Sequence, residues 1–380
     1  MSTDAYAAAR AALEAAHPEL VELSHRIYQN PEVGFEEVQA AAWLTESLER
    51  AGFEVQRGYG EMPTAFVAST GPGPLHIAIC AEYDALPVVG HACGHNVICT
   101  AALGAGMALA PLAAELGLKV TVLGTPAEES GGGKLGFIKG GFFEDVHASM
   151  MVHPFPQDVL TPAIIAVQQL EITYRGRAAH ASGFPWLGIN AADAMVIAQT
   201  AIGLLRQQIL PSDRIHGFVT KGGDASNVIP ELTTADFMVR AGSTERLEEL
   251  VRLVRNCFEA GALATGCSLD LTPDVAYKDM RHDADLAELY RRHAESLGRS
   301  FAPESSPVST DMGNISHEVP SIHPMLGIET HGAVNHQAEF ADACATPSAD
   351  QAIFDGALAM ALACIDAARD EGLRARLLAK

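Results

Sequence analysis

Cysteine, histidine and acidic side chains recur in a few short segments of this 380-residue chain. Cys93 and His95 are separated only by Gly94, which gives the backbone freedom to turn both side chains toward one point. Glu129 and His153 each follow a later apolar run. A thiolate, imidazoles and a carboxylate form a ligand set that zinc and other late first-row metals accept. A single buried thiol is equally well explained as a small hydrophobe, but Glu129 and His153 together favour a metal.

The adjacent acids Glu128 and Glu129 have two interpretations. A charged pair after an apolar strand is costly to bury without partners, so a solvated loop before the glycines at 131–133 would explain both. Alternatively, one carboxylate binds a metal and the other is a general base toward a water that the metal activates. These residues alone leave the choice open.

A further candidate ligand, His336, closes the segment 331–336, which follows a predicted strand at 322–328. The local signal is weak, because the chain has 15 histidines and most of them should be surface or core groups.

Strands that alternate with helices are expected to position these side chains. Residues 75–81, 119–124 and 148–152 are apolar runs of strand length, and polar segments follow each of them. A long helix rich in Ala and Gly is expected at 96–116. This alternation predicts a largely parallel sheet with covered faces, and such sheets bind ligands beyond the carboxyl ends of their strands.

The pattern changes in the middle of the chain. We expect strands and helices there in α+β order, at 164–174, 190–208, 215–220, 233–239 and 244–264. The predicted fold is α/β, with a mixed, largely parallel sheet flanked by helices. Residues 1–162 and 276–380 would form this larger domain, and 163–275 a smaller inserted α+β domain.

Composition excludes several functions. Lys plus Arg is 25 and Asp plus Glu is 47, giving a formal charge of −22 that opposes binding to nucleic acid or to an anionic membrane. We expect no membrane span and no targeting signal. Seven irregularly spaced cysteines in a long chain favour a reducing cytoplasm over a disulfide framework.

Taken in order, the motifs resemble those of the co-catalytic di-metal amidohydrolases and peptidases, the family of aminoacylase, carboxypeptidase G and carnosine dipeptidase. The resemblance covers nearly the whole chain and includes Asp-Ala-Leu-Pro at 84–87, His-Ala-Cys-Gly-His-Asn at 91–96, Pro-Ala-Glu-Glu at 126–129 and Met-Val-His-Pro at 151–154. The cysteine-containing motif is similar to that of indole-acetyl-amino-acid hydrolases and hippurate hydrolase.

Two later segments look most like the subgroup of β-alanyl-lysine dipeptidase and aminobenzoyl-glutamate hydrolase. They are Ser-Thr-Asp-Met-Gly-Asn-Ile-Ser at 309–316 and Pro-Ser-Ile-His-Pro at 320–324. Asn96 replaces an acid that many relatives carry, and Thr310-Asp311 replaces a more acidic stretch. Both departures favour a dipeptidase-like substrate.

The resemblance implies a metallopeptidase-like hydrolase that cleaves the amide bond of a small N-acyl amino acid or dipeptide. It implies two divalent ions per chain, of zinc, manganese, cobalt or nickel. The metal ligands would be Cys93, His95, Glu129, His153 and His336. Glu128 would be the general base and Asp84 would orient a ligand. Glu82 stands where distant relatives have a histidine ligand, and a structural acid is expected there.

For the inserted domain, the resemblance implies a lid that also forms a homodimer contact. His180 would reach the scissile carbonyl, and Asn227 and Arg240 would contact the substrate. An arginine suits a terminal carboxylate, although Arg240 is equally well explained by a surface ion pair.

Three alternatives remain. Cys93 could be the nucleophile of a thiol hydrolase, which would leave Glu128, Glu129 and His153 without a role. The same metal site could cleave ureido or amidine C–N bonds. A non-catalytic dimeric binding protein is the least favoured, because no expected ligand or base is missing.

Overall fold

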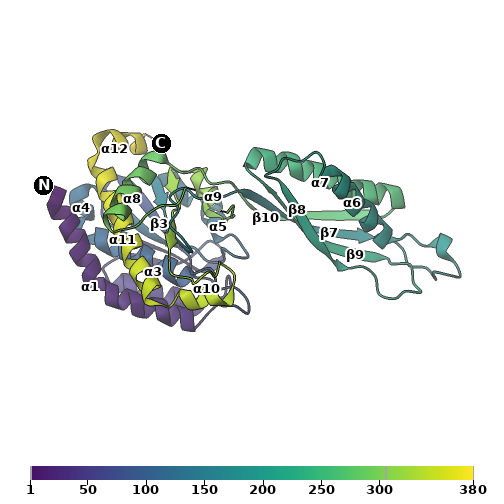
Figure 1. Cartoon of the computed structure of the whole chain (residues 1–380), viewed down its shortest axis with the longest axis horizontal. Helices are drawn as coiled ribbons and strands as arrows, with labels where there is room; N and C mark the ends of the chain where they lie inside the picture. Colours follow the sequence, from purple (N-terminus) through teal and green to yellow (C-terminus); the bar gives the residue numbers. More distant parts are fainter. Residues whose placement is uncertain (1, 304–305, 380) are drawn as a thin grey trace. The chain divides into compact units, whose positions relative to one another are not determined.

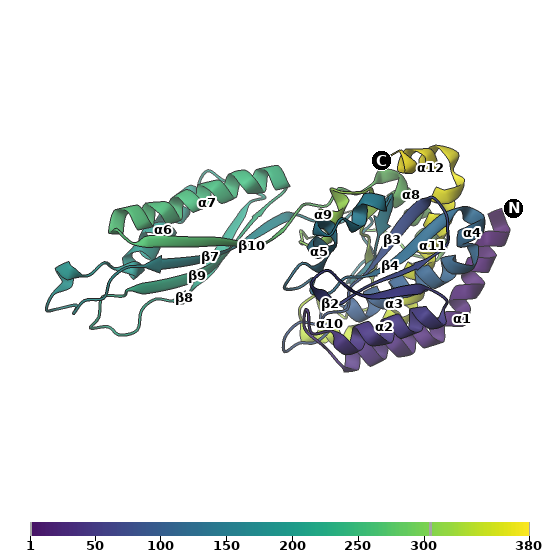
Figure 2. The same cartoon turned by 180° about the vertical axis from the view of Figure 1, so that it is seen from behind.

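The computed structural model of the chain describes residues 2–303 and 306–379. The chain forms two compact units. The first comprises the residues up to Ala163 together with those from Met280 onward, and the second is Ile164–Asp279. Each unit has its own layer of helices and strands, seen from opposite sides in Figures 1 and 2.

The first unit is built on a six-stranded sheet in the order β1-β2-β4-β3-β5-β11. Strands β4, β3, β5 and β11 are mutually parallel, while β1 and β2 form an antiparallel hairpin that extends one edge. A separate parallel pair, β6 and β12, lies outside this sheet. The mixed, largely parallel sheet predicted from the sequence is confirmed. The strands are β1 (Glu54–Tyr59), β2 (Met62–Thr70), β3 (Leu75–Ala81), β4 (Leu118–Gly124), β5 (Ala148–Met150), β6 (His153–Phe155), β11 (Ser321–Ile322) and β12 (Met325–Gly327).

Helices surround this sheet, and α3 is the central one. It packs on β3 and β4, and α1 and α11 pack against it in turn. A Cβ on Gly104 of α3 would lie 2.9 Å from Ala357 Cβ of α11, so the close approach of the two helices requires a glycine. The helices are α1 (Ser2–Gln29), α2 (Val38–Arg50), α3 (His95–Leu109), α4 (Ala113–Leu116), α5 (Gly133–Lys139), α8 (Ala284–Ser296), α9 (Met312–Ser316), α10 (Ala338–Ala343), α11 (Pro347–Arg369) and α12 (Glu371–Leu378).

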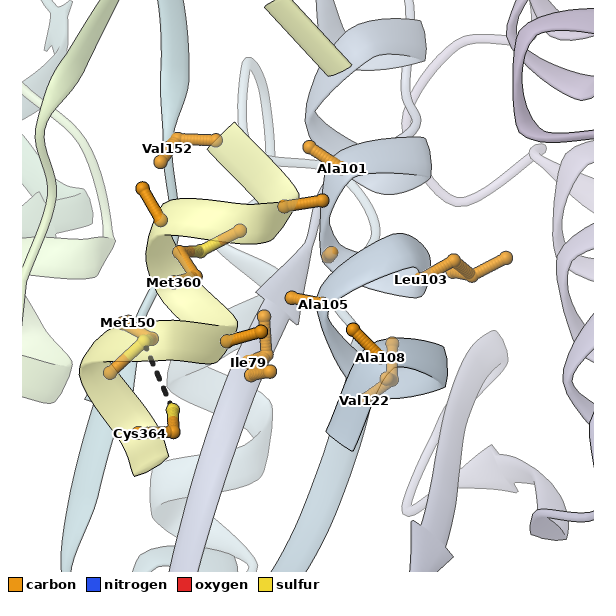
Figure 3. Close-up of a cluster of buried hydrophobic side chains, with 14 of the residues drawn as sticks. Ile79, Ala101, Leu103, Ala105, Ala108, Val122, Met150, Val152, Met360 and Cys364 are labelled. Atoms are coloured by element: carbon orange, nitrogen blue, oxygen red, sulfur yellow. Dashed lines mark hydrogen bonds between the residues drawn. The ribbon is translucent and has the colours of Figure 1, made fainter. Parts of the chain in front are cut away.

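The core between α3, α11 and the sheet consists mainly of small aliphatic side chains. Figure 3 shows Ala101 and Ala105 of α3 close to Ile79 of β3, with Met360 of α11 nearby. Two helical stretches, His95–Leu116 and Pro347–Arg369, are long and apolar enough to cross a membrane by composition alone. Within the structure 78% and 89% of their most apolar stretches are buried.

The second unit is a four-stranded antiparallel sheet in the order β10-β7-β9-β8, with two helices that pack on each other. Alternate residues of β9 are buried, as expected for a strand with one covered face. Strand β8 forms an edge of the sheet and is mostly exposed. The elements are β7 (Ala166–Arg175), α6 (Ala191–Leu205), β8 (Arg214–Lys221), β9 (Leu232–Ala241), α7 (Thr244–Thr265) and β10 (Ser268–Tyr277).

Several elements differ from the sequence-based prediction. Strands β1, β2 and β10 were not expected; β1 is largely exposed, and β10 contains Pro273 at an irregular register. The single strand predicted at 322–328 is instead the two strands β11 and β12, which lie in different sheets on either side of His323 and Pro324. Proline lacks the N–H that a continuous ladder needs.

Candidate metal centre

The candidate metal ligands meet at the carboxyl ends of the parallel strands. Asp84 follows β3, Glu128 follows β4, and His153 begins β6 just after β5. Cys93 lies just before α3, and His95 is the first residue of that helix. This arrangement is the one expected for an open sheet whose strands deliver polar groups to one edge.

Two overlapping groups of potential ligands share the thiol of Cys93. In one group it joins His95 and His153, and in the other it joins Glu129 and His336; within each group the ligand atoms lie within 4.8 Å of one another. Cys93 Sγ lies 3.5 Å from His153 Nε2 and 3.6 Å from His336 Nε2. Two ligands of one tetrahedral zinc ion are about 3.4–3.6 Å apart, given its usual bond lengths. The five candidate ligands are therefore close enough to hold metal.

Hydrogen bonds orient two of the imidazoles. His95 Nδ1 donates to Asp84 Oδ1 at 3.1 Å, and Asp84 Oδ2 accepts the Glu129 backbone N–H at 3.0 Å. His153 Nδ1 donates to the Pro154 carbonyl at 2.8 Å. In both rings Nε2 is left to face the centre, which is the arrangement that metal-binding histidines adopt. Asp84 therefore has the geometry of an orienting acid.

The backbone adopts left-handed conformations around the centre. Gly94 has φ +79°, and a Cβ there would lie 2.4 Å from Pro154 Cγ, so glycine is required between Cys93 and His95. Ala127 and His336 have φ of 56° and 72°, which is unfavourable for residues other than glycine. The His336 backbone N–H donates to the Ala92 carbonyl at 2.8 Å and ties this distant segment to the loop of Cys93.

The two adjacent carboxylates differ in their surroundings. Burial raises the pKa of Glu128 well above its usual value, and the charges of Glu82, Glu129 and Asp311 add to the shift. Burial also acts on Glu129, but a hydrogen bond from His336 and the nearby His95 outweigh it and lower the pKa. One carboxyl is thus suited to exchanging a proton and the other to remaining an anionic ligand.

Three buried atoms indicate that the centre is built for a cation. His95 Nε2, Glu129 Oε1 and Glu82 Oε2 have no hydrogen-bond partner among residues 2–303 and 306–379. Burial raises the pKa of the Cys93 thiol well above its usual value, whereas nucleophilic cysteines need a lowered one. A bound metal would deprotonate this thiol. The donor set fits divalent ions of zinc, manganese, cobalt or nickel.

Sequence reasoning missed two residues behind the centre. The ammonium of Lys134, at the start of α5, donates to both Glu82 and Asp311, and all three side chains are fully buried. The Lys134 backbone N–H also donates to Asp311 Oδ2 at 3.1 Å. A lysine after a run of glycines carries no sequence signal of burial.

The remaining candidate residues, His180, Asn227 and Arg240, all belong to the second unit. His180 is exposed, and its Nδ1 accepts the Gly183 backbone N–H at 3.0 Å. Asn227 is exposed in the loop between β8 and β9. Arg240 is half-buried in β9, where its Nε donates to His216 Nε2 at 3.4 Å.

Comparison with known proteins identifies the family. Residues 78–368 match the model of peptidase family M20/M25/M40. The chain is 38% identical over 365 residues to the Xaa-Arg dipeptidase of Mus musculus, covering 90% of this chain and 84% of that protein. It is 32% identical over 286 residues to a p-aminobenzoyl-glutamate hydrolase of Escherichia coli, covering 70% and 60% of the two chains.

Solved structures share the fold. A dinuclear metal-binding peptidase of family M20 from Bacillus subtilis superposes with a TM-score of 0.74 at 21% identity, covering 94% of this chain and 99% of that one. The chain therefore belongs to the metallopeptidase class with this two-domain fold. Specifically, it is a member of peptidase family M20/M25/M40, and it is a hydrolase of small amide substrates that depends on divalent metal ions.

Proposed function

We propose that this protein binds two divalent ions and hydrolyses the amide bond of a dipeptide or small N-acyl amino acid. The observation that carries the proposal is the pair of ligand groups sharing Cys93, with the raised-pKa carboxyl of Glu128 beside them. The ligands proposed are Cys93, His95, Glu129, His153 and His336.

When bound, the ions would polarise the amide carbonyl and lower the pKa of the attacking water. Glu128 takes a proton from that water and then passes it to the leaving amine. Its raised pKa suits both steps, because a carboxylate of higher pKa is the stronger base and exchanges protons more readily near neutral pH. Asp84 holds the His95 ring with Nε2 toward the centre.

Two residues of the second unit are proposed to act on the substrate directly. His180 Nδ1 accepts backbone N–H groups, so the neutral ring carries its proton on Nε2 and can donate it to the developing oxyanion. One such donor is worth about 2.7–4 kcal/mol of transition-state stabilisation. Arg240 is proposed to bind a terminal carboxylate, and Asn227 to donate to the substrate amide.

For the substrate, we propose a dipeptide whose C-terminal residue is basic. Support comes from 38% and 36% identity to the Xaa-Arg dipeptidases of mouse and human, and from a formal charge of −22 that attracts cations. A panel of β-alanyl-lysine, an Xaa-Arg dipeptide, carnosine, aminobenzoyl-glutamate and hippurate tests this. Higher kcat/KM for the two basic dipeptides is expected, and a preference for aminobenzoyl-glutamate or hippurate would contradict it.

Glu128→Gln tests the base. The variant should retain both ions, because Glu128 is not among the proposed ligands, and should lose about 10²–10⁴-fold in kcat. Glu129→Gln is the matched control, since the same chemical change one residue later should reduce the metal content. Undiminished kcat in Glu128→Gln would remove Glu128 from the base role.

The nucleophilic role of Cys93 is the second candidate, favoured by the two imidazoles within 3.6 Å of the thiol. Activity that survives complete removal of metal by a chelator would support it. Metal-dependent cleavage of ureido or amidine substrates, with none of the amides turned over, would instead favour the other hydrolase class.

We also propose a cytoplasmic homodimer. The seven cysteines are free, as expected in a reducing compartment. Strand β8 is an edge strand, and its Phe218 is 62% exposed, which suits pairing with a second copy. Light scattering should give twice the chain mass, and Phe218→Lys should shift it toward the monomer. A monomeric wild-type protein would contradict the dimer.

A further inference from the structure

We propose that Glu82 is an additional metal ligand, acting through Oε2 on the ion that His95 binds, and that Lys134 is the positioning residue that holds it there. This inference rests on the proposed function and adds a residue to the ligand set. The sequence alone suggested only a structural acid at this position.

The two oxygens of Glu82 have different surroundings. Oε1 accepts a hydrogen bond from the Lys134 ammonium. Oε2 is fully buried, lacks any hydrogen-bond partner in the described part of the chain, and lies 3.5 Å from His95 Nε2. Glu82, His95 and Glu128 each offer a ligand atom within 4.8 Å of the others. A buried carboxylate oxygen without a partner is costly, so its position requires a compensating group.

The separation of the two unpartnered atoms fits two ligands of one ion. His95 Nδ1 donates to Asp84, so Nε2 and Glu82 Oε2 present lone pairs to each other. Either a proton or a cation must therefore lie between or beside them. A well-formed N–H···O bond is about 2.7–3.2 Å long, whereas an imidazole nitrogen and a carboxylate oxygen on one tetrahedral ion are about 3.4 Å apart.

Charge leads to the same conclusion. Glu82, Lys134 and Asp311 carry two negative charges and one positive charge in a fully buried cluster. Burial opposes the charged form of Lys134, but Asp311 and Glu82 outweigh it and raise the pKa, so the lysine remains an ammonium. One negative charge is left over, and the free oxygen of Glu82 faces the metal centre. A divalent ion supplies the missing positive charge.

Lys134 fixes the carboxylate in place. Its ammonium lies between Glu82 and Asp311, and its backbone N–H donates to Asp311 Oδ2 at 3.1 Å. With Oε1 held in this way, rotation of the Glu82 carboxylate away from the centre would break a charged hydrogen bond. Asp311 itself contacts the lysine and supplies no atom to the groups of candidate ligands.

The test compares Glu82→Gln with Asp311→Asn in the full-length protein. Each variant removes one negative charge from the cluster and preserves side-chain size, but only the first alters the atom that faces His95. Metal-free protein is titrated with Zn²⁺ by calorimetry, and Co²⁺ loading is followed by visible absorption. For Glu82→Gln we expect affinity for one of the two ions to fall about 10–100-fold, with an altered Co²⁺ spectrum. For Asp311→Asn we expect both affinities within about threefold of wild type and an unchanged spectrum.

Wild-type affinities and spectrum in Glu82→Gln would overturn the inference. If that variant does not fold, Glu82→Asp retains the charge but withdraws the oxygen by one methylene, and unchanged binding of both ions would overturn the inference equally. A wild-type protein that binds no ion would refute the proposed function itself. Two tightly bound ions in wild type with an unaffected Glu82→Gln would refute only the role of Glu82.

Discussion

At the scale of single residues, His76 shows how burial couples a side chain to pH far from the metal centre. It lies near the start of β3, where Nδ1 donates to the Asp145 carbonyl at 3.1 Å and Nε2 accepts from Thr121 Oγ1 at 2.8 Å. Burial, reinforced by the charge of Lys119, lowers the pKa of His76 to about 4. Protonation would remove the acceptor that Thr121 uses, so the folded protein requires the neutral ring.

This requirement predicts a loss of stability in acid. An unfolded histidine has a pKa of about 6.5, so as pH falls from 6.5 to 4 the unfolded state binds the proton and the folded state does not. The free energy of unfolding should fall over that range by about 3 kcal/mol on account of His76 alone. His76→Gln should reduce the difference in unfolding free energy between pH 7 and pH 4.5, measured in urea. An unchanged difference would show that His76 is not a source of acid sensitivity.

Short-range sequence patterns predicted the ligands but not their support. Cys93 and His95 are two residues apart, and Glu129 and His153 follow apolar runs that the sequence identifies as strands. The contact between Lys134 and Asp311 joins residues 177 positions apart, so it becomes visible only when the chain has folded. Asn96, which looked like a determinant of substrate, instead donates to Ser24 Oγ and the Cys344 carbonyl and anchors the start of α3.

At the scale of elements, two glycines in the helices of the second unit predict opposite effects. A Cβ on Gly261 of α7 would lie 2.3 Å from the Ala194 carbonyl oxygen of α6, so any side chain forces these helices apart. A Cβ on Gly203 of α6 would meet nothing within 4 Å. Gly261→Ala should therefore destabilise the unit by about 1–3 kcal/mol, as overpacking does. Gly203→Ala should stabilise it by up to about 1 kcal/mol, because alanine favours the helix.

Urea unfolding of the two alanine variants beside wild type measures both effects. Equal changes in the two variants would show that helix propensity alone decides, and that α6 and α7 are not packed as closely as the structure shows. Both substitutions lie in helices distinct from the candidate site residues, so kcat serves only to confirm that the variants are folded.

Elements with strong periodicity were predictable, and elements defined by their neighbours were not. The buried strands β3 and β4 and the helices α3 and α11 follow from apolar runs and helical spacing. Strand β1 has no apolar face, and it forms because it pairs with β2 at the edge of the sheet. Such strands depend on tertiary context that a local pattern does not contain.

At the scale of the whole molecule, metal binding should stabilise one unit and not the other. All five proposed ligands belong to the first unit, and the second unit has a hydrophobic core of its own. A ligand that binds only the folded state adds RT ln(1 + [L]/Kd), or about 2.7 kcal/mol at one hundred times Kd. Chelation should therefore increase hydrogen exchange in residues 1–163 and 280–380 and leave residues 164–279 nearly unchanged.

Hydrogen exchange followed by mass spectrometry, with and without chelator, checks this. Restoration of Zn²⁺ should return protection to the first unit, which separates loss of metal from irreversible damage. Equal deprotection of both units, or no effect of chelation on either, would contradict the assignment of the ions to the first unit.

The central claim is that this chain is a two-metal amide hydrolase, and one paired measurement tests it most directly. Metal content is determined by plasma emission on the purified protein, and turnover of the substrate panel is measured before and after chelation. We expect about two divalent ions per chain, as a dinuclear site with activated water requires, and amide cleavage that is lost with the metal and returns with it. A protein that contains no metal, and whose amide cleavage is unaffected by chelation, would contradict the account and return Cys93 to consideration as the nucleophile.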